Sequence, residues 1–114
     1  NPLHYNNRGY AKYENGDFEG AVEDFSQCIK LDPNYAYAYN NRAAAYIRLE
    51  KWDEASADCD KAISLDANYG YSYMNRGIAR EMKRDVEGAC EDWTKAIELG
   101  AANAETYYST VCNN

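Results

Sequence analysis

The feature that most constrains the fold is an internal repeat, because identical residues recur 34 positions apart along the chain. This offset aligns Tyr5 with Tyr39 and Tyr73, and Tyr107 continues the series. The other repeated columns are Asn7, Asn41 and Asn75; Arg8, Arg42 and Arg76; Ala11, Ala45 and Ala79; Ala21, Ala55 and Ala89; Asp24, Asp58 and Asp92; Ile29, Ile63 and Ile97; and Leu31, Leu65 and Leu99. So many identities at one offset predict an array of repeated structural units.

Each repeat contains two helical patterns separated by a short breaker. In the first repeat the breaker is 14–17, and the unit closes at 30–34, where Pro33 stops a helix and Asn34 tolerates a turn. The predicted helices span residues 3–14, 18–31, 36–49, 52–65, 70–83, 86–99 and 102–112. The sequence therefore predicts an all-α protein of helical hairpins, in which the last helix covers the apolar face of the third hairpin.

Composition and charge exclude several classes of partner. The 114 residues include 12 Lys plus Arg and 19 Asp plus Glu, for a formal net charge of −7, which repels the phosphate backbone of nucleic acids. Apolar runs such as 43–47 are far shorter than the roughly 20 residues of a membrane helix, so we expect no membrane insertion. Because neither Met nor a leader pattern opens the chain, we interpret it as a fragment or mature region. Its localisation stays unknown: we expect a soluble domain and favour the cytoplasm, with the periplasm or export as alternatives.

The repeated unit resembles the tetratricopeptide repeat, a helix-turn-helix with the same period. The family pattern of aromatic and small residues matches the first unit at Tyr5, Gly9, Ala21, Phe25, Cys28 and Pro33, and the third at Tyr73, Gly77, Ala89, Trp93 and Ala96. The second unit departs from it at Ala43, Cys59 and Ala67. The resemblance implies a right-handed α-solenoid of antiparallel hairpins, a tetratricopeptide repeat superhelix of about seven helices. It also implies one domain over 1–114, with repeats at about 2–35, 36–69 and 70–103 and a capping helix at about 102–112.

A repeated arginine is followed, at one constant spacing, by a repeated aspartate on the partner helix. The pairs are Arg8 with Asp24, Arg42 with Asp58, and Arg76 with Asp92. Because a partly buried Arg needs a carboxylate and its planar fork matches one, this spacing predicts a hydrogen-bonded ion pair inside each hairpin. In the alternative interpretation, the arginines clamp a carboxylate of a ligand.

No constellation of catalytic or metal-binding residues is present in the sequence. The single histidine, His4, has no nucleophile motif beside it, and no glycine pattern follows a strand, so we predict no enzymatic activity and no cofactor. Cys28, Cys59, Cys90 and Cys112 lack the spacing of zinc ligands. We expect them to be small core residues, with one alternative: Cys112 could form a bridge with Cys90 in an oxidising compartment.

The first helix of each hairpin is expected to carry the function, because stacked hairpins rotate so that these helices line a concave surface. The predicted partner-binding residues on this surface are Asn7, Tyr10, Tyr13, Tyr37, Asn40, Asn41, Arg48, Tyr71, Met74, Asn75 and Ile78. Asn amides can donate to and accept from a peptide backbone, and the resemblance implies the same role. In the alternative, these amides bond within their own hairpin or are solvated.

These observations predict a protein-protein interaction scaffold that binds an extended or helical segment of a peptide or partner protein, without catalysis. The alternative is a structural segment of a longer solenoid that forms homo-oligomers through its terminal helices. Family members that bind chaperone tails clamp a C-terminal carboxylate with Lys, Arg and Asn. The matching positions here are Asn6, Tyr10, Asn41, Tyr71 and Asn75, of which only Asn41 agrees, so we do not expect a chaperone tail as the partner.

Overall fold

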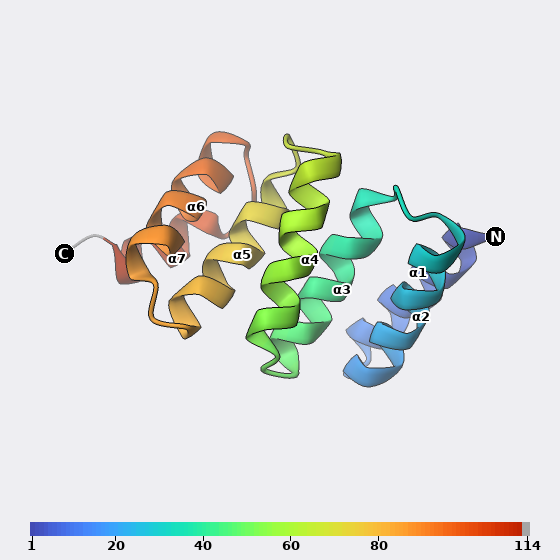
Figure 1. Ribbon diagram of the computed structural model, residues 1–114. Coiled ribbons are helices and arrows are strands. Elements are labelled where there is room, and N and C mark those ends of the chain that lie inside the picture. Colours follow the sequence, from blue (N-terminus) through green and yellow to red (C-terminus); the bar gives the residue numbers. More distant parts are fainter. Residues whose placement is uncertain (113–114) are drawn as a thin grey trace.

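The protein is an array of helical hairpins, seen in a computed structural model that describes residues 1–112. The helices are α1 (Pro2–Glu14), α2 (Phe18–Leu31), α3 (Ala36–Arg48), α4 (Trp52–Leu65), α5 (Gly70–Met82), α6 (Val86–Glu98) and α7 (Ala104–Val111). Figure 1 shows three hairpins side by side in chain order, with the two ends of the chain at opposite ends of the array. The all-α prediction is confirmed, and each helix begins and ends close to its expected position.

The turns inside the hairpins share one backbone conformation. Gly16, Glu50 and Arg84 occupy the same position in the three repeats, and each has a positive φ, at 85°, 59° and 69° respectively. Only glycine adopts this left-handed conformation without a steric penalty. The repeat therefore imposes the same turn on all three hairpins, although only the first hairpin has the residue best suited to it.

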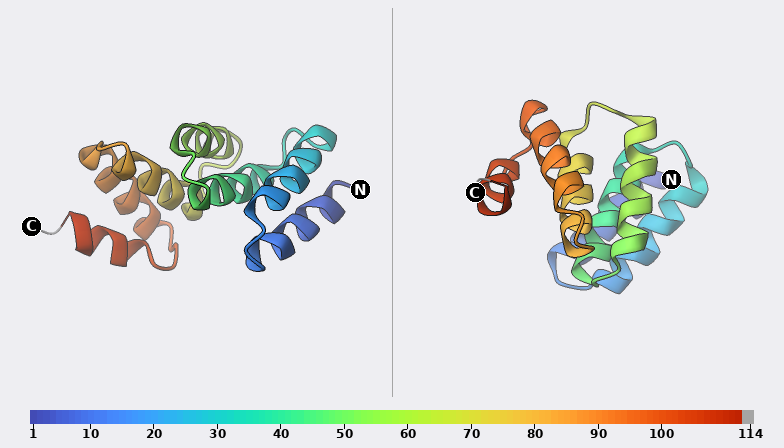
Figure 2. Two further views of the ribbon diagram at one scale, coloured as in Figure 1. Left: turned by 90° about the horizontal axis from the view of Figure 1, so that it is seen from below. Right: turned by 60° about the vertical axis from the view of Figure 1, so that its left-hand side comes forward.

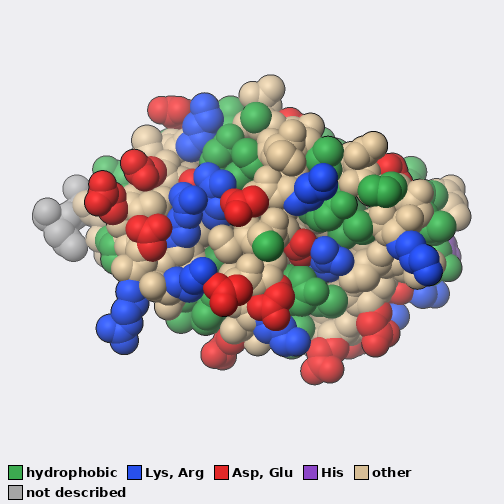
Figure 3. Space-filling model, in the orientation of Figure 1, with side chains coloured by type: hydrophobic (Ala, Val, Ile, Leu, Met, Phe, Trp, Pro, Cys, Tyr) green, Lys and Arg blue, Asp and Glu red, His purple; other side chains and the backbone are tan. Residues whose placement is uncertain are grey.

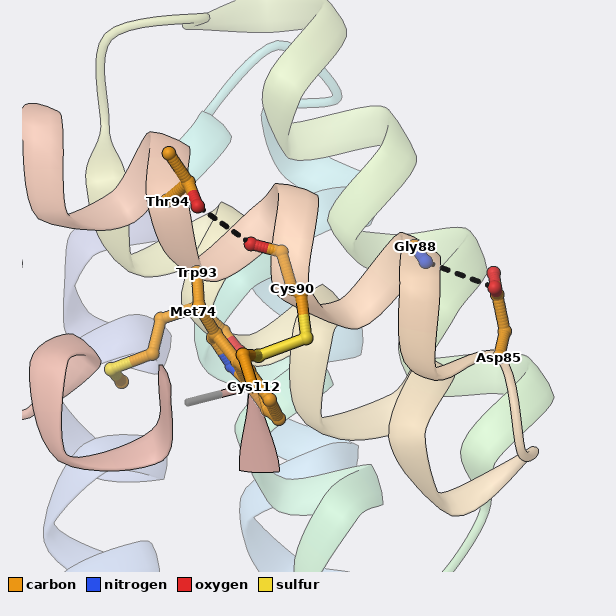
Figure 4. Close-up of a disulfide and its surroundings, with 7 residues drawn as sticks. All are labelled: Met74, Asp85, Gly88, Cys90, Trp93, Thr94 and Cys112. Atoms are coloured by element: carbon orange, nitrogen blue, oxygen red, sulfur yellow. Dashed lines mark hydrogen bonds between the residues drawn. A yellow bond between two sulfur atoms is a disulfide. The ribbon is translucent and has the colours of Figure 1, made fainter. Parts of the chain in front are cut away.

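The beginnings of the second helices differ in how their free N–H groups are satisfied. The carboxylates of Asp17 and Asp85 each accept a hydrogen bond of 3.0 Å, from the backbone N–H of Gly20 and Gly88 respectively (Figure 4 shows the second). The equivalent residue before α4 is Lys51, whose side chain makes no such bond. The first and third hairpins thus have a side-chain cap that the second lacks.

The core of each hairpin depends on a small residue opposite a larger one. A methyl group added to Gly9 would lie 2.8 Å from the Phe25 ring, so glycine is what allows α1 to approach the ring of α2. Gly77 stands in the same relation to Trp93. In the second hairpin both partners change, and Ala43 shares a core cluster with Cys59. Two of the three departures of the second unit from the family pattern, Ala43 and Cys59, therefore compensate each other.

The array curves toward its first helices. Contacts join α1 to α3 and α3 to α5, whereas no comparable contact joins α2 to α4 or α4 to α6 in the described part of the chain. The first helices are thus closer together than the second helices, which places α1, α3 and α5 on the inner side of the curve, as expected for rotating hairpins. Figure 2 shows this curved arrangement from two further sides.

The C-terminal end of the array is covered by α7. Ala104 of α7 is fully buried and joins a cluster with Ala96 of α6, and the ring of Tyr107 stacks on that of Trp93 with centroids 5.6 Å apart. A disulfide joins Cys90 of α6 to Cys112, with Cα atoms 5.9 Å apart (Figure 4). The sequence left this pairing open, and the structure contains it. Covalent and packing contacts together hold α7 over the third hairpin.

The surface carries charges of both signs. On the face seen in Figure 3, which α4 crosses in Figure 1, Lys and Arg side chains lie interspersed with Asp and Glu. Ion pairs such as Arg76–Asp60 and Lys83–Asp53 connect neighbouring hairpins. No helix within residues 1–112 is long and apolar enough to cross a membrane.

Candidate functional site

The predicted partner-binding residues all lie on the inner helices α1, α3 and α5, but they differ in exposure. Tyr10 and Tyr37 are exposed, with 51% and 42% of their area accessible, and Asn7 and Arg48 are exposed as well. Asn40 and Asn75 are buried. The inner side therefore has exposed tyrosines beside asparagines that the helices partly enclose.

Two asparagine pairs connect successive inner helices. The Nδ2 of Asn41 donates to Oδ1 of Asn6 at 3.1 Å, which joins α3 to α1, and Nδ2 of Asn75 donates to Oδ1 of Asn40 at 2.9 Å, which joins α5 to α3. We call these four residues the asparagine pairs. The bonds run between hairpins rather than within one. Asn7, the first residue of the repeated asparagine column, is exposed on α1 and has no such partner among the described residues.

Each asparagine pair leaves one whole amide nitrogen and one whole amide oxygen without a protein partner in the described part of the chain. In the first pair these are Nδ2 of Asn6 and Oδ1 of Asn41, and in the second Nδ2 of Asn40 and Oδ1 of Asn75. None of them is a fully buried orphan, since within residues 1–112 that description applies only to the Ser72 hydroxyl. The unpaired donor and acceptor of each pair therefore keep some contact with solvent, although Asn6, Asn40 and Asn75 are buried as whole residues.

Four tyrosine rings form a continuous cluster at the N-terminal ends of α3 and α5. The ring centroids of Tyr35 and Tyr37 are 5.6 Å apart, those of Tyr37 and Tyr69 are 4.8 Å apart, and those of Tyr69 and Tyr71 are 5.5 Å apart. We call these residues the tyrosine array. Burial raises the pKa of Tyr35 and Tyr69 above the usual value for tyrosine. The hydroxyl of Tyr71 accepts a 3.1 Å hydrogen bond from the backbone N–H of Ala102, which fixes that ring.

The predicted set of partner-binding residues does not include Asn6, Tyr35 or Tyr69, although Asn6 belongs to the inner stripe of the first helix. Asn6 and Asn40 are separated by one full repeat, and so are Tyr35 and Tyr69, so the period already contained the signal. The two tyrosines precede their helices and do not belong to a helical stripe, which is why an analysis of helix faces omitted them.

Other predicted site residues have partners elsewhere in the protein. The guanidinium of Arg48 lies 4.5 Å above the centroid of the Phe18 ring at the start of α2, which holds it against the first hairpin. The rings of Tyr10 and Tyr13 stack with centroids 6.4 Å apart. A hydrogen bond with Glu14 raises the pKa of the exposed Tyr10 hydroxyl.

Two predicted residues of α5, Met74 and Ile78, are half-buried. The backbone carbonyl of Met74 accepts a 3.2 Å hydrogen bond from Nε1 of Trp93, and its side chain packs on the cluster under α7 (Figure 4). Met74 therefore packs into the core beneath the inner side. In the repeat it occupies the position of Asn6 and Asn40 in the preceding units.

The repeated arginines bind aspartates of their own hairpins, as the spacing predicted. Both nitrogens of each guanidinium fork donate to both carboxylate oxygens, with distances of 2.7 to 2.9 Å. Arg42 also donates to the Ser26 hydroxyl of the preceding hairpin, and Arg76 to Asp60, each at 3.0 Å. These contacts confirm the structural interpretation and leave the repeated arginines committed to the hairpins rather than to a ligand.

Neither metal-binding nor nucleophilic groups gather on the inner side of the described chain. No group of three or more His, Cys, Asp or Glu residues is placed to hold a metal within residues 1–112. His4 is exposed on α1, where its ring meets that of Tyr5 edge to face. Cys28 and Cys59 are buried free thiols, and burial raises the pKa of both. What this face offers is neutral hydrogen-bonding groups and aromatic rings.

The family profile described as "TPR repeat" matches residues 9–50, and the one described as "Tetratricopeptide repeat" matches residues 36–69. The second TPR domain of human RPAP3, solved with the HSP70 peptide SGPTIEEVD, is 31% identical to this chain, with a TM-score of 0.87. That alignment covers 97% of this chain and 98% of the RPAP3 domain.

Two further solved domains are similar over nearly their whole lengths. The Arabidopsis OM64 TPR domain is 30% identical, with a TM-score of 0.93, over 99% of this chain and 95% of that domain. The TPR2B domain of yeast Sti1, in a complex named for pHsp70, is 27% identical, with a TM-score of 0.91, over 98% of this chain and 96% of the other. The repeat-wide sequence matches and the complete structural overlap agree, and the chain therefore belongs to the tetratricopeptide repeat family.

Proposed function

We propose that this chain is an interaction scaffold that binds an extended segment of a partner protein on its inner side and performs no chemistry of its own. The observation that carries the proposal is the geometry of the asparagine pairs. Each pair leaves one amide nitrogen and one amide oxygen without a protein partner among the described residues, between two inner helices and not completely enclosed. A polypeptide backbone offers the complementary carbonyl and N–H groups.

The internal hydrogen bond of each asparagine pair supports this role. Because one edge of each amide is already bonded to its neighbour, the free edges are held in place before a ligand arrives. Ordering them costs less entropy on binding than ordering free side chains would. Interchanging the nitrogen and oxygen of both amides in a pair leaves one donor and one acceptor free, so the proposal does not depend on that assignment.

Similar domains bind acidic peptides, but the corresponding positions here are neutral. The RPAP3 and Sti1 domains were solved with peptides of HSP70 or HSP90, and the RPAP3 ligands SRMEEVD and SGPTIEEVD both end in EEVD. The positions at which chaperone-binding members carry cations are Asn6, Tyr71 and Asn75 in this chain. Without a cation, the cost of desolvating a carboxylate is not compensated, so the proposed partner is not an acidic C-terminus.

The units that carry the proposed surface are repeats at about 2–35, 36–69 and 70–103, closed by a capping segment at about 102–112. The predicted residues Asn7, Tyr10, Tyr13, Tyr37, Asn40, Asn41, Arg48, Tyr71, Met74, Asn75 and Ile78 are proposed to border the ligand. To these the geometry adds Asn6, Tyr35 and Tyr69.

A peptide-array screen tests the proposal with a groove variant of four substitutions: Tyr37→Ala, Asn41→Ala, Tyr71→Ala and Asn75→Ala. Selective binding by the wild type and its loss in the variant is the expected result, with circular dichroism showing that both are folded. Glu23→Ala on the outer helix α2 serves as the matched control, because Glu23 is exposed and far from the asparagine pairs in the fold.

A second outcome of the same experiment addresses self-association. Sedimentation velocity over a range of concentrations measures the oligomeric state, and exposed apolar residues at the two ends of the array, such as Leu3 and Ile97, are where a homo-oligomeric contact would form. Absence of any peptide ligand, together with concentration-dependent association, overturns the scaffold proposal in favour of a structural role.

A further inference from the structure

The tyrosine array gives the inner side a chemical character that the asparagine pairs alone do not have. Its rings meet at angles of 74°, 90° and 54° in succession, so neighbouring rings present their faces in different directions. Tyr37 is 42% exposed, and Tyr35, Tyr69 and Tyr71 are half-buried. The array is thus a set of partly open aromatic faces held in place by mutual contact.

Ring packing makes the tyrosine array rigid. Tyr69 contacts rings on both sides, and Tyr71 is fixed by its hydrogen bond with Ala102 and by the apolar cluster under α7. Tyrosine offers a large contact area at a low entropy cost, and immobilised rings lower that cost further. A ligand with flat, apolar side groups would lie against the exposed parts of these rings, which are already held in place.

The hydrogen-bonding groups around the array are suited to a ligand rich in acceptors. The hydroxyls of Tyr35, Tyr37 and Tyr69 have no protein partner among the described residues, and that of Tyr71, which accepts from Ala102, still has its proton to donate. A polyproline II segment has a backbone free of internal hydrogen bonds, and its prolines expose carbonyls but no N–H groups. Aromatic-lined grooves dock such segments because their extended shape is preformed.

Charge decides which flanking residues suit such a ligand. Besides burial, the acidic Asp32 raises the pKa of Tyr35 in the array. By contrast, Arg48, the one cation among the predicted site residues, is the last residue of α3 and lies on the Phe18 ring. Glu14 contacts Tyr10, and the whole chain carries a formal charge of −7. Complementarity therefore favours Lys or Arg beside the segment and disfavours Asp or Glu.

We propose that the tyrosine array, Tyr35, Tyr37, Tyr69 and Tyr71, docks a proline-rich segment in the polyproline II conformation whose flanking residues are basic. The inference rests on the proposed function, because it names the class of peptide that the inner side takes. The prolines pack against the exposed parts of the rings, and the carbonyls of the segment accept hydrogen bonds from the tyrosine hydroxyls and from the unpaired amide nitrogens of the asparagine pairs.

Isothermal titration calorimetry with three capped peptides of equal length tests the inference. The first has a proline core flanked by lysines, the second a Gly/Ser core with the same flanks, and the third the proline core flanked by glutamates. We expect the first to bind about tenfold more tightly than either of the others. Equal or tighter binding of the Gly/Ser peptide overturns the role of proline, and equal or tighter binding of the glutamate-flanked peptide overturns the charge argument.

Substitutions separate the rings from the rest of the surface. Tyr37→Leu keeps an apolar side chain and removes the ring, and we expect it to weaken binding of the lysine-flanked proline peptide about tenfold. Tyr108→Leu on α7, outside the array, is the matched tyrosine control and should bind like the wild type. Because Tyr37 is exposed, its replacement leaves the fold intact, which a thermal melt verifies. Unchanged affinity of Tyr37→Leu overturns the inference.

The peptide-array screen keeps this inference distinct from the function on which it rests. If the screen finds ligands that require the asparagine pairs while the proline peptide fails to bind, only the proline inference is wrong. If no peptide of any class binds, the scaffold function itself is wrong.

Discussion

The first hairpin, α1–α2, and the second, α3–α4, are built on the same pattern but differ in their surroundings. The side chain of Arg8 is 50% exposed in its ion pair, whereas that of Arg42 is 20% exposed, because α3–α4 has a neighbouring hairpin on each side (Figure 1). Asp24 has a second cation, Lys12, at 3.2 Å, whereas Asp58 depends on Arg42 alone. Position in the array, and not only sequence, therefore decides how much a repeated contact contributes to stability.

The second hairpin also departs from the first in its local chemistry. It has Ala43 and Cys59 where the first has Gly9 and Phe25, and Glu50 where the first has Gly16. The first change is a compensated exchange of volume, but the second places a side chain in a left-handed turn. The two hairpins thus form a natural comparison in which single substitutions convert a feature of one into that of the other.

The largest expected effect is on the central ion pair. The substitution Arg42→Met leaves the buried Asp58 carboxylate without a cation. We expect it to lower the free energy of unfolding by about 3 kcal/mol. Arg8→Met should cost clearly less, since Arg8 is exposed and Lys12 remains beside Asp24. Urea denaturation measures both, and the double variant Arg42→Met with Asp58→Leu should recover most of the loss. Equal losses for the two single variants would contradict the role of position.

The next effect concerns the contact between Gly9 and Phe25. Gly9→Ala places a methyl group 2.8 Å from the Phe25 ring, and overpacking of this kind costs about 2 kcal/mol. Adding Phe25→Cys converts the contact to the arrangement of the second hairpin, so the double variant should be more stable than the sum of the single effects predicts. The coupling free energy from a double-mutant cycle should be about 1 kcal/mol or more. Strictly additive effects would show that the two positions do not compensate.

A smaller effect is expected at the turn inside each hairpin. Glu50→Gly removes a side chain from a residue with φ of 59° and should stabilise the protein by about 1 kcal/mol. Gly16→Ala makes the opposite change at φ of 85°, in open space, and should destabilise it by a similar amount. Thermal unfolding monitored by circular dichroism compares the two. Shifts of the same sign would mean that backbone strain does not distinguish these turns.

The smallest effect is a difference in acid titration between the two aspartates. The hydrogen bond from Arg8 lowers the pKa of Asp24, so its contribution to stability is complete above the unfolded pKa of about 3.9 and is lost as the pH falls through the folded value. Burial raises the pKa of Asp58, although Arg42 opposes this shift. Ionisation of Asp58 therefore lowers the free energy of unfolding as the pH rises from the unfolded pKa through the folded pKa.

Carboxyl ¹³C chemical shifts followed by NMR between acid and neutral pH resolve the two groups. The midpoint for Asp24 should lie below that for Asp58. Asn34→Ala, in the exposed turn after α2, is a control that should leave both midpoints unchanged. A higher midpoint for Asp24 than for Asp58 would contradict the assigned burial of the central pair.

The period of the sequence was sufficient for the fold, because a hairpin that recurs at one constant period can stack in few ways. The Arg and Asp columns predicted the ion pairs, since both partners lie in one hairpin, where helix geometry fixes their distance. The asparagine pairs were not predicted. Their partners, such as Asn6 and Asn41, are on different hairpins, and the rotation between hairpins is not visible in a pattern of single helices.

The C-terminal cap is a second feature that the sequence pattern predicted only in part. Gly100 and Asn103 both have positive φ values and redirect the chain, so that α7 begins at Ala104 and runs back along α6 to bring Cys112 beside Cys90. The sequence indicated a seventh helix and offered this disulfide as one alternative. Which alternative holds depends on the path of a short turn, and no periodicity encodes that path.

The central claim is that the amide edges of the asparagine pairs contact the backbone of a bound peptide. The most direct test is an NMR titration of the ¹⁵N side-chain amides with the tightest ligand from the peptide-array screen. We expect the Nδ2 resonances of Asn6, Asn40, Asn41 and Asn75 to shift on binding, whereas the side-chain amide resonance of Gln27 on the outer helix α2 should not. Saturating binding that leaves the four asparagine resonances in place would contradict it.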